Sequence, residues 1–148
     1  MKFYFALLVA AVCAFGMTTA AARNHPTPST PARCPEPAEI GPLHLDGLWH
    51  AEFVGLPQGA TLLVEKHPEL AGSVRGGVNR GGSKTLAAGD VDQGEFTLEE
   101  SPDGQRISAT WLGTVVAHSC GKEIRGLWNS TSSPISYPFV LRKLPGWH

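Results

Sequence analysis

From Leu45 onward, apolar and polar side chains alternate with a period of two. The segment "RISATWLGTVV" at 106–116 shows this alternation most clearly. On one side of it lie Ile107, Ala109, Trp111, Gly113 and Val115. Such alternation is typical of a β-strand with one buried face. No segment of this region has apolar residues at i, i+3, i+4 and i+7 over eleven residues, as an amphipathic helix requires. The pattern therefore predicts an all-β domain.

Eight candidate strands follow from this period, with turn sequences between them. They cover residues 45–54, 60–66, 69–76, 84–91, 94–100, 105–117, 121–129 and 137–144. Pro57-Gln58-Gly59 and Ser101-Pro102-Asp103-Gly104 are two of the separating turns. Short connections favour antiparallel neighbours, and a closed sheet has no open edge that could aggregate. We therefore predict an eight-stranded antiparallel meandering β-barrel, with a two-sheet β-sandwich as the alternative.

One motif recurs at alternate positions of these strands: an apolar residue, a small residue and a large apolar residue. It occurs at Leu45-Gly47-Trp49, Leu70-Gly72-Val74, Ile107-Ala109-Trp111 and Ile124-Gly126-Trp128, and Leu86-Ala88 begins it again before Asp90. We expect these residues to face inward, where the small residue lets the strand coil sharply and leaves room for an indole from a neighbour.

The motif places Trp49, Trp111 and Trp128 inside the barrel, and Phe139 of the last strand joins them. An eight-stranded barrel is just wide enough to be filled by side chains or to hold one small ligand. The four aromatic residues are therefore either the packing of the interior or the wall of a pocket for a small apolar or aromatic ligand. Periodicity does not separate these two interpretations.

The N-terminal region has two parts that differ from the barrel sequence. Residues 1–22 combine Lys2, an apolar run and Ala20-Ala21-Ala22, which is the composition of a cleaved signal peptide. Residues 23–42 contain half of the 12 prolines and are predicted to form a proline-rich arm, followed by the barrel domain at 43–148. We expect a secreted or periplasmic protein whose mature chain has no membrane span. The arm is either a disordered stalk or an element that reaches a partner.

Two cysteines remain after the predicted cleavage, Cys34 and Cys120. In an exported protein such a pair is expected to form a disulfide, which here would tie the arm to the barrel. The alternative is that Cys120 is a nucleophile assisted by His118, which lies two positions earlier and on the same face of a strand.

Charge and motifs exclude several function classes. The formal net charge is -1, and removal of Lys2 with the signal makes it -2, which argues against nucleic acid as a partner. The six histidines lack ligand spacing, and no nucleophile elbow or phosphate-binding loop is present, so we predict no metal, no cofactor and no catalytic residue.

The acidic residues between Asp90 and Asp103 are interpreted as a solvated hairpin. The glycine-rich segment at 75–83 is interpreted as a flexible hairpin tip, and Asn129-Ser130-Thr131 is a glycosylation sequon that matters only in a eukaryotic source.

The "LDGLW" segment, through Leu45, Gly47 and Trp49, resembles the first strand of lipocalins and avidin-type proteins. It also looks like the first strand of small periplasmic inhibitors of bacterial metalloproteases. The first resemblance implies a small ligand in the barrel, and the second implies a secreted hydrolase as partner, reached by the arm or a barrel-edge loop. In those inhibitors the disulfide joins two strands, whereas Cys34 here precedes the first strand. A structural or cell-surface accessory protein with a filled barrel is the third hypothesis.

Overall fold

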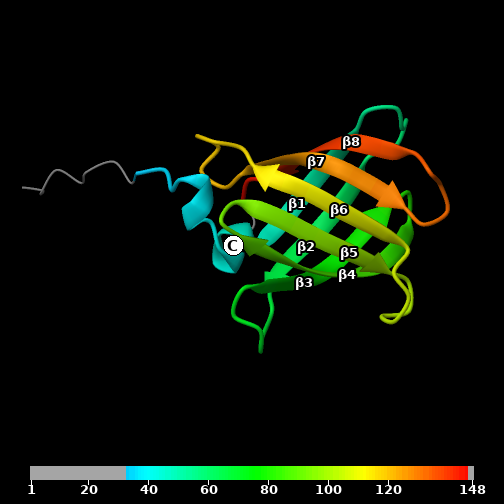
Figure 1. The fold of residues 1–148 in the computed structure, drawn as a ribbon, viewed down its shortest axis with the longest axis horizontal. Coiled ribbons are helices and arrows are strands. Elements are labelled where there is room, and N and C mark those ends of the chain that lie inside the picture. The colour runs from blue at the N-terminus through cyan, green and yellow to red at the C-terminus, as the bar shows by residue number, and fades with distance from the viewer. Residues whose placement is uncertain (1–32, 147–148) are drawn as a thin grey trace, which may run out of the picture. The chain divides into compact units, whose positions relative to one another are not determined.

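Eight strands follow one another in chain order around a closed barrel (Figure 1). The computed structural model describes residues 33–146, so the predicted signal peptide lies outside the described residues. The strands are β1 (Gly47–Phe53), β2 (Ala60–Lys66), β3 (Ser73–Arg80), β4 (Ser83–Asp92), β5 (Glu95–Ser101), β6 (Ala109–Val115), β7 (Glu123–Ser130) and β8 (Ser136–Lys143). Each strand pairs antiparallel with the next, and β1 pairs with β8 to close the barrel. The predicted meandering barrel is confirmed, and the sandwich alternative is wrong.

The third strand begins later than the sequence predicts. It covers Ser73–Arg80 instead of 69–76, and Gly76 and Gly77 lie inside it. The turn to β4 consists of Gly81 and Gly82, which have φ angles of +60° and +89°. A two-residue turn with positive φ at both positions suits the right-handed twist of a hairpin. Most of the hairpin tip predicted at 75–83 is therefore strand, and the turn itself consists of these two glycines.

This turn also sets the register of β4 and corrects the predicted inward motif. Pairing of Arg80 with Ser83 directs Ala87 inward, with 7% of its surface exposed, and turns Leu86 outward, with 57% exposed. A shift of one residue moves every side chain of a strand to the other face. The inward expectation is therefore wrong for Leu86, Ala88 and Asp90, and also for Leu70, Gly72 and Ile107, which are exposed and precede their strands.

The inward glycines lie where neighbouring strands approach most closely. A Cβ atom on Gly126 would lie 1.9 Å from the carbonyl oxygen of Leu112, and one on Gly113 would lie 3.0 Å from Cζ of Phe139. No side chain larger than a hydrogen atom fits at Gly126 without a backbone shift. Small residues are therefore required here by the close approach of neighbouring atoms, and the expected sharp coiling of the strands stays a prediction.

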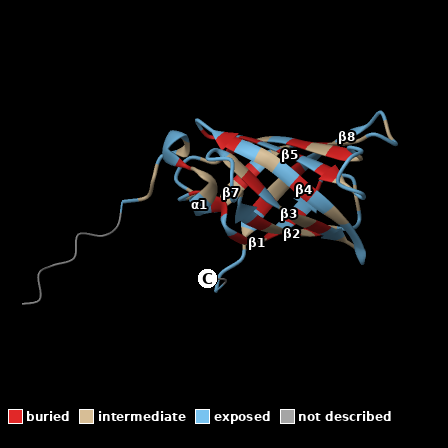
Figure 2. Ribbon diagram, turned by 90° about the horizontal axis from the view of Figure 1, so that it is seen from below, coloured by how far each residue is buried: buried red, intermediate tan, exposed pale blue. Residues whose placement is uncertain are grey.

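Two short helical segments cover one end of the barrel (Figure 1). They are a 3-10 turn, η1 (Pro37–Glu39), and one α-helical turn, α1 (Pro42–Leu45). Ile40, between them, and Leu45, the last residue of α1, are buried, with 3% and 0% of their surface exposed, and belong to the same hydrophobic core as the barrel interior. Buried segments of the strands and of this end are red in Figure 2. Residues 33–42, which the sequence places in the proline-rich arm, thus form a cap on this end.

Candidate functional site

The four aromatic residues predicted for the interior are all buried. The exposed fraction is 0% for Trp49 and Trp111, 2% for Phe139 and 7% for Trp128. Trp111 contacts the Phe139 ring edge-on, with centroids 4.9 Å apart, and the Phe53 ring at 5.3 Å. Phe53 also contacts Trp128, at 5.6 Å. These rings fill the half of the barrel that lies away from the helical cap.

Trp49 lies apart from the other indoles, at the capped end. Its Nε1–H donates to the carbonyl oxygen of Leu45 at 2.7 Å. The Lys143 ammonium donates to the carbonyl oxygen of His44 at 2.8 Å and lies 5.9 Å from the centre of the Trp49 ring. Burial is the largest cause that lowers the pKa of Lys143. The structure therefore brings Trp111, Trp128 and Phe139 together and assigns Trp49 to closure of the opposite end.

A buried carboxylate joins the two inner indoles. Glu100 of β5 is only 2% exposed, and its Oε1 accepts hydrogen bonds from Nε1 of Trp111 at 2.8 Å and of Trp128 at 2.9 Å. Its Oε2 accepts from the Thr85 hydroxyl at 2.9 Å. The sequence interpretation counted Glu100 with the solvated acidic residues, which is wrong. The alternation of β5 already contained the signal, because Phe96 and Leu98 face inward and Glu100 is the next residue on that face.

Arg80 supplies the positive charge beside this carboxylate. Its Nη2 lies 3.2 Å from Oε1 of Glu100, and its side chain is 24% exposed. The guanidinium carbon lies 4.3 Å from the centre of the Trp128 ring and 5.3 Å from that of Phe53. Both distances are within the range of a cation–π contact. Arg80 therefore closes the uncapped end of the barrel above a carboxylate and two aromatic rings.

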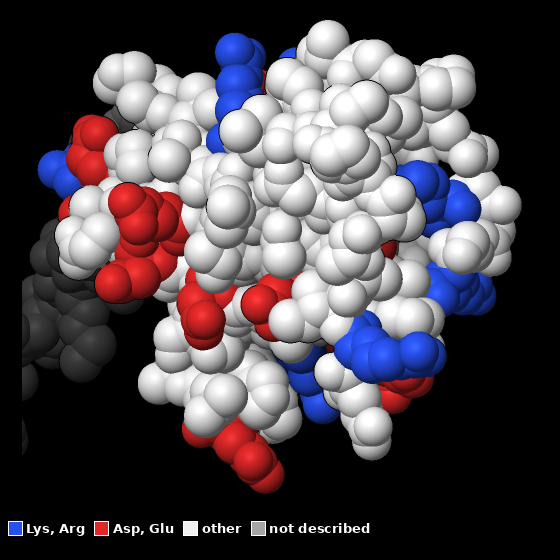
Figure 3. Space-filling view, turned by 45° about the vertical axis from the view of Figure 1, so that its right-hand side comes forward, with Lys and Arg blue, Asp and Glu red and all other residues white. Residues whose placement is uncertain are grey.

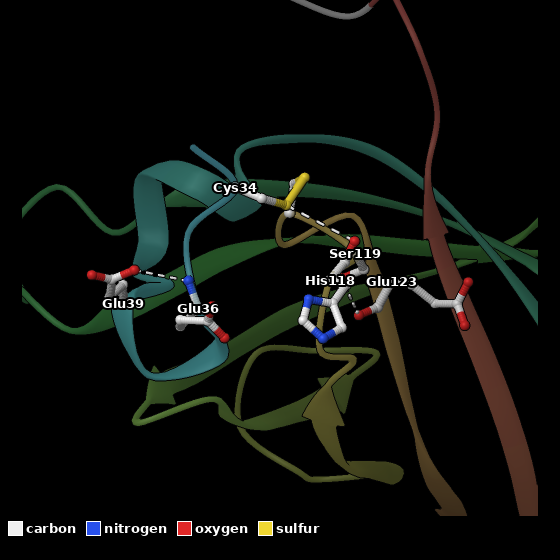
Figure 4. The surroundings of a disulfide bond; sticks show 7 residues. Cys34, Glu36, Glu39, His118, Ser119 and Glu123 are labelled. Atoms are coloured by element: carbon white, nitrogen blue, oxygen red, sulfur yellow. Dashed lines mark hydrogen bonds between the residues drawn. A yellow bond between two sulfur atoms is a disulfide. The ribbon is translucent and has the colours of Figure 1, made fainter. Parts of the chain in front are cut away.

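The cysteines form the predicted disulfide at the capped end (Figure 4). Cys34 and Cys120 are 86 residues apart in the chain, and their Cα atoms are 4.8 Å apart. The Cys34 sulfur lies 3.9 Å from the carbonyl oxygen of His118, whereas the imidazole extends away from the bridge. Because the sulfur of Cys120 is bonded to that of Cys34, the alternative of a Cys120 nucleophile is wrong for this state of the protein.

Apolar cavities open on the outer surface of the barrel. One of about 700 Å³ is lined by the apolar residues Leu63, Leu86 and Ile107, and its lining also includes the charged residues Glu65, Arg75 and Glu99. Another of about 660 Å³ shares Leu63 and Leu86. Leu86 and Ile107 are 57% and 45% exposed, which is high for large apolar side chains. Trp49, Trp128 and Phe139 line neither of these two cavities.

A further cavity of about 460 Å³ includes Trp111 in its lining together with Leu70, Asp90 and Leu112. Trp111 has no exposed surface, so its indole contributes no wall that a ligand could touch. Apart from the buried Val74 and Leu98, its other lining residues are exposed or half-buried, which places this cavity on the outer surface as well.

On the face shown in Figure 3, most Asp and Glu side chains lie in the left and lower parts and most Lys and Arg side chains on the right. Several of the carboxylates are held ionised by local partners. The backbone N–H groups of Arg106 and Gln105 and the Arg106 side chain hold the pKa of Asp103 well below its ordinary value. A hydrogen bond from Arg125 is the largest cause that lowers the pKa of Glu123. These are surface interactions that fix turns and strand ends.

Within residues 33–146, no three His, Cys, Asp or Glu side chains are arranged so that they could hold a metal ion. In the same part of the chain, no helix has the length and apolar character needed to cross a membrane.

No family model matches the chain, and no curated protein matches it. Among solved structures, the chain is similar to a de novo designed fluorescence-activating β-barrel, with 17% identity, a TM-score of 0.44, and coverage of 70% of this chain and 96% of that chain. The resemblance to lipocalins, avidin-type proteins and protease inhibitors stays a prediction. What is established is a closed, eight-stranded antiparallel barrel with a filled, aromatic interior and one disulfide.

Proposed function

We propose that this chain is an exported, non-catalytic binding protein that holds its partner on the outer surface of the barrel. The observation that carries the proposal is the filled interior. Trp111 and Phe139 are fully or almost fully buried and contact each other, and the buried Glu100 uses both of its oxygens on protein donors. A ligand entering the middle of the barrel would have to displace the packed rings of Trp111 and Phe139, whereas a ligand on the outside would not.

The outer cavity around Leu86 is the surface best suited to this role. Its volume of about 700 Å³ is in the range that accommodates a drug-sized molecule or a few side chains of a partner. Gly104 of the β5–β6 loop approaches Leu86, since a Cβ atom there would lie 3.4 Å from Cδ1 of Leu86. The loop that carries Ile107 therefore forms one wall of the cavity, and the outer face of β2–β4 forms its floor.

Binding of an apolar dye, anilinonaphthalene sulfonate, tests the proposal. The double variant Leu86→Glu/Ile107→Glu is expected to bind the dye at least about tenfold more weakly, a loss of about 1.4 kcal/mol. The matched control is Leu112→Glu/Leu127→Glu, because these residues are 53% and 46% exposed on β6 and β7. The control should keep wild-type affinity, and both double variants should keep wild-type melting curves. Equal loss in the two variants would contradict a specific outer site.

An inhibitor of a secreted hydrolase is the second candidate, favoured by the anchored N-terminal cap. The disulfide fixes Cys34 on the barrel end, directly after the part of the predicted arm at 23–32 that lies outside the described residues. We propose that this arm would be the inhibitory element. The test is inhibition of a panel of secreted metallo- and serine proteases by the mature chain beside a variant that lacks residues 23–32. Inhibition that survives the truncation would refute the role of the arm.

A further inference from the structure

The buried Glu100 carboxylate lies next to a cation that is itself packed against aromatic rings. It lies at the uncapped end of the barrel and contacts the guanidinium group of Arg80 and the indole N–H of Trp128. The same guanidinium group lies over the rings of Trp128 and Phe53. A buried carboxylate combined with aromatic faces is the combination that recognises organic cations. In this structure the cation in that position is a side chain of the protein itself.

The contacts of Arg80 with Glu100, Trp128 and Phe53 do not select a guanidinium group over other cations. Of the five N–H donors of arginine, one nitrogen, Nη2, reaches Glu100, and the pair is therefore not the two-pronged type that selects arginine. Nε of Arg80 is buried and has no hydrogen-bond partner. The interactions that hold the cation are thus its charge and its position over two rings, and another organic cation could supply both.

Arg80 lies at the end of a hairpin, directly before its turn. Arg80 is the last residue of β3, and its pairing with Ser83 is the last pair of the β3–β4 hairpin. Gly81 and Gly82 form the turn, and glycine gives the backbone more conformational freedom than any other residue. Opening of this hairpin end breaks one strand pair, and the 24% exposure of the Arg80 side chain shows that the site already borders solvent.

We propose that Glu100, Trp128 and Phe53 form a binding site for a small organic cation, a guanidinium or alkylammonium compound, which Arg80 occupies from within when no ligand is bound. Ligand binding exchanges one cation for another, so the buried carboxylate never loses its counter-charge. This site is separate from the outer cavity around Leu86 and does not depend on it.

The experiment uses methylguanidinium and the indole N–H signals of the full mature chain in NMR. In Arg80→Met, which keeps a long side chain but removes the charge, methylguanidinium should shift the Trp111 and Trp128 indole signals saturably and raise the melting temperature. The Trp49 signal is the internal control, because that indole lies at the opposite end and should not move. Sodium chloride at equal ionic strength controls for screening.

Two further variants define the site. Arg80→Met/Glu100→Gln keeps the shape of the acid but removes its charge, and it should bind methylguanidinium at least about tenfold more weakly. Arg75→Met removes another arginine of β3, one whose side chain is 55% exposed beside Glu65, and it should behave as wild type. The proposed site would be overturned if methylguanidinium did not shift the Trp111 and Trp128 signals of Arg80→Met. It would also be overturned if Arg75→Met responded at the same methylguanidinium concentrations as Arg80→Met.

Wild-type protein tests the exchange itself and remains informative if Arg80→Met does not fold. Methylguanidinium should shift the same two indole signals, at higher concentration than in Arg80→Met, because the ligand competes with Arg80. A wild-type protein whose Trp111 and Trp128 signals stay fixed at concentrations that leave it folded would overturn the exchange of Arg80 for an external cation.

Discussion

Replacement of Trp111 by alanine separates a filled barrel from a hollow one. The indole is 0% exposed, it packs against the rings of Phe53 and Phe139, and it donates a hydrogen bond to Glu100. Removal of a large aromatic side chain from such a position costs about 3–5 kcal/mol of unfolding free energy, because the cavity left behind does not close fully. That is a large fraction of the stability of a typical domain. Replacement of a residue in a pocket wall by alanine would lower the unfolding free energy much less, since such a residue already borders empty space.

Urea unfolding followed by far-UV circular dichroism is the suitable assay, since the substitution alters the intrinsic fluorescence. The unfolding free energy of Trp111→Phe should lie between that of wild type and that of Trp111→Ala, about 2 kcal/mol below wild type. Phenylalanine keeps most of the apolar volume but loses the hydrogen bond to a charged group. Leu112→Ala is the control at the next, outward position and should change stability by about 0.5 kcal/mol or less. A loss below about 1 kcal/mol for Trp111→Ala would refute the filled interior.

Three other predictions follow from the geometry. Joint replacement of Cys34 and Cys120 by alanine should lower the unfolding free energy by about 4–5 kcal/mol in the chain-entropy account, because the bridge closes a loop with a separation of 86 residues, and a urea curve measures it. Gly126→Ala should destabilise by about 3 kcal/mol through its clash with a backbone carbonyl, whereas Gly72→Ala, which has no atom within 4 Å, should be neutral in thermal melts. The pKa of Asp103 is lower in the folded than in the unfolded chain, so its stabilising effect is present above the unfolded pKa and is lost as pH falls. Wild type should therefore lose more stability than Asp103→Asn between about pH 5 and pH 2, as equilibrium unfolding at each pH would show.

Much of the barrel could be predicted because its strands obey a simple period. β2 begins and ends where the alternation does, and Trp49, Trp111, Trp128 and Phe139 lie inside as predicted. The disulfide was also predictable, since only two cysteines follow the predicted signal peptide.

The register of β4 could not be predicted in the same way. It depends on which of several glycines form the turn, and the segment at 75–83 offers four of them. The pairing of Arg80 with Ser83 is decided by side-chain packing across β2, β3 and β4, which a local pattern does not contain.

The buried ion pair at the uncapped end was missed for a related reason. The alternation along β5 gives Glu100 an inward-facing position. A carboxylate is stable at such a position only if hydrogen-bond donors from other strands contact it. Those donors come from Arg80, Thr85, Trp111 and Trp128, up to 28 residues away along the chain. Such a constellation exists only after the barrel has closed.

An NMR titration of the wild-type chain with anilinonaphthalene sulfonate tests the central claim most directly, because it observes both faces of the barrel wall at once. The account predicts saturable shifts of the Leu63, Leu86 and Ile107 methyl groups on the outer face. It predicts no shift of the Trp111 indole N–H or of the Leu62 methyl groups, which lie inside. Saturable shifts of Trp111 and Leu62 with the Leu86 methyl groups unchanged would place the ligand in the barrel and contradict the account.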